Sequence, residues 1–118
     1  MKWKSKKRYS HAEIVGERVV SPEGVFLGRI ERLMHEVGDG RVSFALVRFA
    51  GFLGLGNDLY PLPWATLNRR PGRHGFVFNI DRDLLLEAPT FGPDTRRAAS
   101  TELADSISRH YGVERVAS

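Results

Sequence analysis

The sequence predicts a small, mostly β domain of about six short strands, followed by one helix near the C-terminal end. Two observations indicate the strands: short apolar runs, and turn-forming glycine and proline residues that separate them every ten residues or so. A third indicates the helix, because a four-residue apolar spacing begins only after residue 91. The 118 residues fit one domain, which at this size buries roughly two thirds of its unfolded surface.

The first two strands are expected at Glu17–Val20 and Phe26–Glu36. The turn between them is Ser21–Gly24, where Pro22 presets φ and the glycine tolerates a positive φ. Gly28 interrupts the second strand, which predicts a bulge or a close approach of a neighbouring backbone.

The third strand, Arg41–Phe49, follows the hairpin signal Gly38–Gly40. It alternates between two faces, and both of them are apolar. Such a strand is usually covered on both sides. We therefore expect a closed barrel with a helix or a second subunit packed outside it.

The later elements are shorter. They are an apolar, glycine-rich loop, a short strand, a turn of helix, two strands flanking a hairpin loop, and a helical turn capped by its first residue. In chain order they occupy Gly51–Gly56, Asp58–Leu62, Pro63–Leu67, Asn68–Arg70 with Phe76–Ile80, and Asp81–Glu87. The expected core residues include Trp64, Phe44, Leu46, Ile30, Val77 and Ile80.

The C-terminal helix carries one apolar stripe and ends at Gly112. A helix of this length is not stable alone, so the stripe must dock on something. The stripe consists of Ala99, Leu103, Ile107 and Tyr111.

The charge is unevenly distributed, and this divides the chain into three segments. Residues 1–10 form a basic arm that we expect to be disordered, 11–92 the barrel-like domain, and 93–118 a helical extension. The net charge of +4 comes from the arm, since the remaining chain carries 13 basic and 14 acidic residues. The residues that could contact an anion or RNA are Lys2, Lys4, Lys6, Lys7, Arg8, Arg69, Arg70 and Arg73.

The composition argues against several function classes. The absence of cysteine excludes disulfides and thiolate chemistry and suits a cytoplasmic location. Four scattered histidines lack metal-ligand spacing, and no serine lies in a nucleophile elbow. No apolar run is long enough for an integral membrane segment. We expect no catalytic residues, no cofactor and no metal, and therefore no enzyme.

A series of short motifs runs in order between Ile14 and Phe91. They are Gly16–Val19, Gly24, Leu27–Ile30, Gly40–Val42, Phe49–Gly56, Pro63–Trp64, Leu67 and Leu85–Phe91. Through these motifs the stretch resembles the PRC-barrel domain family, and Phe49–Trp64 is the most specific part. The resemblance implies a small β-barrel that serves as an adapter, without catalytic residues. Domains of this family occur in the photosynthetic reaction-centre H subunit and in a bacterial factor that helps mature the small ribosomal subunit.

Two functional hypotheses follow. The first is a non-enzymatic adapter that binds an unknown protein partner and itself forms a homodimer, although the apolar loop could instead fold onto the barrel end. The second is an RNA- or ribosome-associated factor that uses the basic arm and the Arg69–His74 hairpin. The candidate protein contacts are Phe52, Leu53, Leu55, Leu103, Ile107 and Tyr111.

Overall fold

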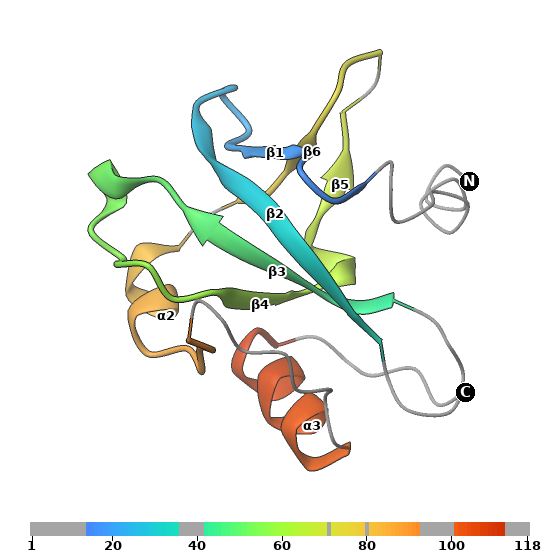
Figure 1. Ribbon diagram of the computed structural model, residues 1–118, viewed down its shortest axis with the longest axis vertical. Helices are drawn as coiled ribbons and strands as arrows, with labels where there is room; N and C mark the ends of the chain where they lie inside the picture. The colour runs from blue at the N-terminus through green and yellow to red at the C-terminus, as the bar shows by residue number, and fades with distance from the viewer. Residues whose placement is uncertain (1–13, 36–41, 71, 80, 93–100, 113–118) are drawn as a thin grey trace.

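The computed structural model describes residues 14–35, 42–70, 72–79, 81–92 and 101–112 (Figure 1). They form a six-stranded sheet with helices beside it, which confirms the predicted mostly β fold with a C-terminal helix. The strands are β1 (Arg18–Val20), β2 (Phe26–His35), β3 (Val42–Phe49), β4 (Tyr60–Pro63), β5 (Asn68–Arg69) and β6 (Phe76–Val77). The helices are η2 (Gly51–Leu53), η3 (Trp64–Thr66), α2 (Arg82–Leu86) and α3 (Thr101–His110).

The sheet is a half-barrel whose two edges are joined by the chain itself. Its strand order is β4-β3-β2-β1-β6-β5, in which β1 to β4 form an antiparallel meander and β6 pairs with β1 in parallel. The edge strands β4 and β5 are consecutive in sequence and only η3 lies between them. The sheet must therefore curl. The predicted small β-barrel is confirmed, and the ladder between the described strands stays open where η3 joins β4 to β5.

The inner face of the half-barrel holds the larger hydrophobic core. Its side chains come from the segment before β1, from the sheet, from η3 and from α2. The largest wholly buried members are Phe76, Ile14, Ile30, Leu62, Leu67 and Leu85.

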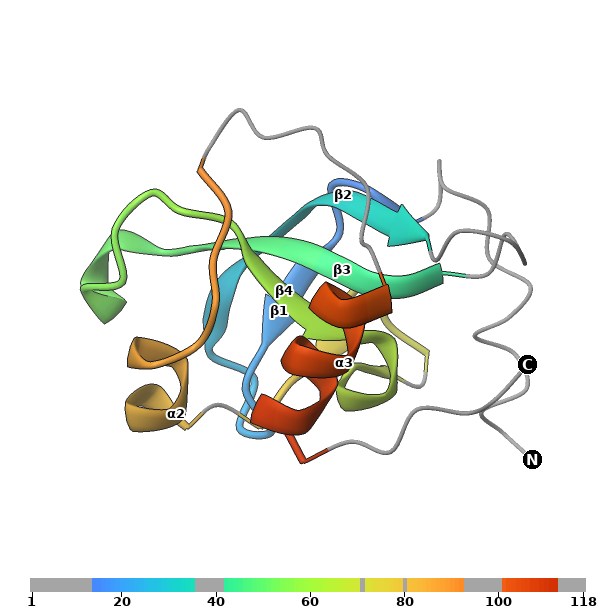
Figure 2. The same cartoon turned by 90° about the horizontal axis from the view of Figure 1, so that it is seen from below.

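A second core lies on the outer face of β3, under α3 (Figure 2). Phe44 and Leu46 of β3 pack there against Ala104 and Ile107 of α3. Their chain neighbours Ala45 and Val47 point into the inner core instead. The prediction that β3 is covered on both faces is confirmed, and the outer cover is a helix of the same chain.

The expected core residues divide into three groups. Ile30, Phe44 and Leu46 are buried as predicted. Trp64 and Val77 are half-buried, with the Trp64 ring 5.4 Å from the Phe76 ring. The last, Ile80, lies outside the described residues.

The helical turn expected after Asp81 is confirmed as α2. The Asp81 carboxylate accepts a hydrogen bond from the Leu84 backbone N–H at 3.2 Å, which satisfies one of the unpaired donors of the first turn. The cap marks the start of α2, whose first residue, Arg82, donates a hydrogen bond to the turn that follows β3.

Candidate functional site

The apolar loop after β3 folds partly onto the barrel and partly away from it. Leu55 is buried in the inner core, and Leu53 packs against that core from a half-buried position. The Tyr60 hydroxyl donates a buried hydrogen bond to the Leu55 carbonyl at 3.1 Å. Phe52 points the other way, and 68% of its surface is exposed.

A side chain of α2 braces this loop from outside. Arg82 Nε donates to the Leu53 carbonyl oxygen at 2.9 Å. Gly54 ends η2 with a φ of +69°, so the chain turns sharply at that point. The position of Phe52 is therefore set by the contacts of its neighbours.

Leu86 of α2 is a second exposed apolar side chain at this end of the molecule, 51% exposed. It lies four residues from Arg82, which places both on one face of the helix. Both views show η2 and α2 at the same end of the half-barrel (Figures 1 and 2). Phe52, Leu53 and Leu86 are called the Phe52 end below.

Leu86 was not among the contact residues predicted from the sequence, although the sequence holds a signal for it. Leu84, Leu85 and Leu86 are consecutive, and a helix that buries one face cannot bury all three. The structure buries Leu85, half-buries Leu84 and leaves Leu86 exposed.

Four of the six proposed protein contacts pack within the chain. Leu55 and Ile107 are buried in the chain's own cores. Leu103 and Tyr111 are half-buried and pack against the same cores. Three residues of the apolar stripe, Leu103, Ile107 and Tyr111, therefore dock on their own chain, and the fourth, Ala99, lies outside the described residues.

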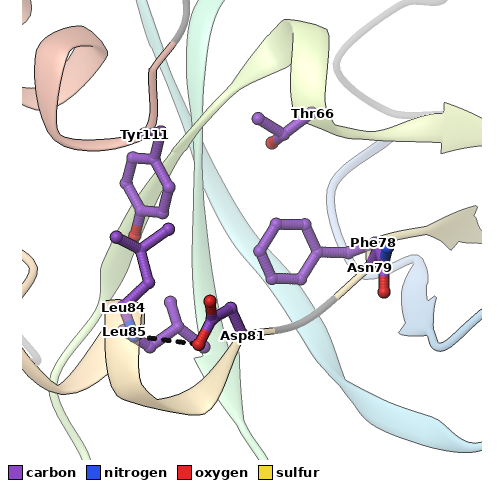
Figure 3. A pocket seen from close by; sticks show the side chains of 7 residues that line it. All are labelled: Thr66, Phe78, Asn79, Asp81, Leu84, Leu85 and Tyr111. Carbon is purple, nitrogen blue, oxygen red and sulfur yellow. Dashed lines mark hydrogen bonds between the residues drawn. The ribbon is translucent and has the colours of Figure 1, made fainter.

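A cavity of about 240 Å³ opens between η3, α2 and the end of α3 (Figure 3). Asp81 and Tyr111 are its titratable lining residues. The Asp81 carboxylate is turned toward the Leu84 N–H that it caps, as the dashed line in Figure 3 shows. Asp81 therefore serves as the cap of α2.

Burial raises the pKa of Tyr111 well above its ordinary value of 10.0, and the nearby Tyr60 hydroxyl raises it further. The pKa of Tyr60 is also raised, first by burial and then by the Asp58 carboxylate. Both hydroxyls therefore stay protonated at neutral pH and are poor general bases.

The predicted anion-binding residues are only partly brought together. Arg69 is half-buried, and its guanidinium lies 5.0 Å from the centre of the Phe76 ring, so part of its side chain packs within the domain. Arg73 is exposed at the hairpin turn, and Arg70 Nη1 donates to the His74 carbonyl oxygen at 3.1 Å. The arm residues Lys2, Lys4, Lys6, Lys7 and Arg8 lie outside the described residues.

Within the described ranges, His, Asp and Glu side chains nowhere gather in a group of three that could hold a metal ion. No helix in those ranges has the length and apolar character that crossing a bilayer requires.

The family follows from a comparison with known domains. The PRC-barrel domain matches residues 6–85, which is more than half of the chain. The chain belongs to the PRC-barrel domain family. The PRC-barrel match covers all six strands and ends within α2, so α3 lies beyond it. A comparison with curated proteins found no match.

Proposed function

We propose that this PRC-barrel chain is a non-enzymatic, cytoplasmic module that binds another protein chain at the Phe52 end. One observation carries the proposal: Phe52 is 68% exposed on a turn that its neighbours hold in place. Burying a phenylalanine side chain is worth roughly 1.5–3 kcal/mol. That free energy is available to a partner and is not used within the chain.

The turn is suited to binding because little of it must be ordered when a partner arrives. The Tyr60 hydroxyl holds the Leu55 carbonyl on one side of Phe52, and Arg82 holds the Leu53 carbonyl on the other. Affinity rises when a contact residue is already in its bound position. Aromatic anchors of this kind carry a large share of the binding energy in protein interfaces.

A second copy of the chain is the partner we propose first. A symmetric dimer would place the Phe52 end of one copy against the same surface of the other. The contact would then cover the exposed side chains of Phe52 and Leu86 in both copies. Such an apolar contact depends little on salt, unlike a contact between charges.

The test is the mass in solution, measured by light scattering after size exclusion at low and high salt. We expect a dimer at both salt concentrations. Phe52→Asp should give a monomer with unchanged far-ultraviolet circular dichroism. Val25→Asp is the matched control, because Val25 is 51% exposed but lies in the β1–β2 turn, and it should remain a dimer.

Leu53→Asp is a poor test, because Leu53 packs on the inner core and the charge would disturb the fold. A monomeric wild type would rule out the proposed self-association. The proposal as a whole would fail if immobilised wild type and Phe52→Asp also retained the same proteins from a lysate.

A further inference from the structure

Three arginines lie directly opposite one another on the outer face of three neighbouring strands. Arg18 on β1 pairs with Arg29 on β2, and Arg29 pairs with Arg48 on β3. Directly paired residues project to the same face of a sheet. Since adjacent strands are roughly 4.8 Å apart, the three side chains form a continuous basic row across the outer face of the curled sheet.

The row continues onto the β5–β6 hairpin through Gly75. A Cβ atom at Gly75 would lie 2.8 Å from Arg18 Cγ and 3.5 Å from Arg70 Cδ, so both side chains pass over this glycine. The Arg70 N–H also donates to the Gly75 carbonyl oxygen. Arg70, Arg18, Arg29 and Arg48 are called the arginine row below.

Most of the positive charge of the arginine row is not neutralised by carboxylates. Glu31 pairs with Arg48 at 3.2 Å. Arg29 donates to the Gly16 carbonyl oxygen at 2.9 Å, and Arg70 likewise donates to a carbonyl, so both keep their full charge. Glu17 is the chain neighbour of Arg18, and its carboxylate lies 3.7 Å from the His74 ring nitrogen.

An aromatic ring lies within the row. Phe26 is 38% exposed, and the guanidinium carbons of Arg18 and Arg29 lie 5.8 and 5.5 Å from its centre. A flat ring flanked by two arginines resembles the stacking surfaces that bind single-stranded nucleic acids.

We propose that the arginine row binds the phosphodiester backbone of a single-stranded nucleic acid, with Phe26 stacking on one base. Guanidinium groups bind phosphate oxygens through paired N–H donors, and a continuous row of them suits the repeating phosphates of a polyanion. An acidic peptide would match the charge but would have no use for the ring. The site keeps Arg70 of the hairpin expected from the sequence, and adds Arg18, Arg29 and Arg48.

The test is fluorescence anisotropy of a labelled oligouridine with the full-length protein, at several salt concentrations between 50 and 200 mM. Replacing Arg18 or Arg29 by Gln should weaken binding several-fold, and each should reduce the slope of log K against log salt by about 0.7. Phe26→Leu should weaken binding about fivefold or more with the salt slope unchanged. Arg109→Gln is the matched control, since Arg109 is exposed on α3 and the variant loses the same charge.

The proposal is overturned if Arg18→Gln and Arg109→Gln give the same affinity and slope. It is also overturned if polyglutamate, or vesicles of anionic lipid, displace the oligouridine as effectively as unlabelled oligouridine does. An oligothymidine of the same length tests whether the bound backbone is RNA or DNA. Equal affinity for the two oligonucleotides means that either nucleic acid is bound. Phe52→Asp lies at a separate surface and should bind normally, so this test and that of the proposed function can fail independently.

Discussion

Gly28 on β2 lies so close to Arg48 on β3 that a Cβ atom at Gly28 would be 2.3 Å from the Arg48 carbonyl oxygen. The clash is with backbone, which cannot move aside as a flexible side chain can. Gly28→Ala would therefore force β2 and β3 apart in the middle of the sheet. We expect a loss of at least about 2 kcal/mol in the free energy of unfolding, measured by urea denaturation.

Gly51→Ala is the control for that substitution. A Cβ atom at Gly51 meets nothing within 4 Å, and its φ is not positive. Its free energy of unfolding should change by less than about 0.5 kcal/mol. Equal midpoints for Gly28→Ala and the wild type would show that the strands can separate at little cost.

Ile107 joins α3 to the outer face of the sheet and is wholly buried. Ile107→Ala should lower the free energy of unfolding by about 2–5 kcal/mol, because the deleted atoms leave a cavity between α3 and β3. Ser106→Ala, on the exposed side of the same helix, should change it little. Similar values for the two variants would mean that α3 is not docked in solution.

Tyr111 should make the fold sensitive to alkali. Since burial raises its pKa above the ordinary 10.0, the folded chain keeps the proton that the unfolded chain releases. Its contribution to stability is complete below pH 10 and is lost as the pH rises through the folded-state pKa. Urea midpoints of Tyr111→Phe should therefore fall less than those of the wild type between pH 9 and pH 11.

At pH 7 the same variant should differ from the wild type by less than about 1 kcal/mol. The reason is that the Tyr111 hydroxyl has no hydrogen-bond partner among the residues the structure describes. Parallel loss of stability in both proteins up to pH 11 would contradict the assigned role of the hydroxyl.

Much of the fold was predictable because each element has a local signal. The Asp81 cap and the proline and glycine of the first turn are such signals, because each of these residues shapes the backbone only a few positions away. The two apolar faces of β3 likewise predicted cover on both sides. What covers the outer face could not be predicted, because the α3 stripe would suit its own sheet or a neighbour's equally well.

The candidate sites depend on register and on packing, which local patterns do not contain. Arg18, Arg29 and Arg48 are far apart in the sequence and become neighbours only through strand pairing. Phe52 and Leu55 looked equivalent in the sequence, yet the turn at Gly54 exposes one and buries the other. The sequence predicted the apolar loop, but it did not predict which side chains of the loop are exposed and which are buried.

The edge strand β4 carries two prolines, Pro61 and Pro63, each paired across to β3. Alternate residues of a strand direct their backbone nitrogens to the same side. Tyr60 and Leu62 direct theirs toward β3, so the proline nitrogens face outward and carry no hydrogen. The free edge thus lacks the donors that an added strand would need. A partner that contacts β4 must therefore be recognised by side chains, and copies of the half-barrel cannot stack edge to edge through β4 into fibres.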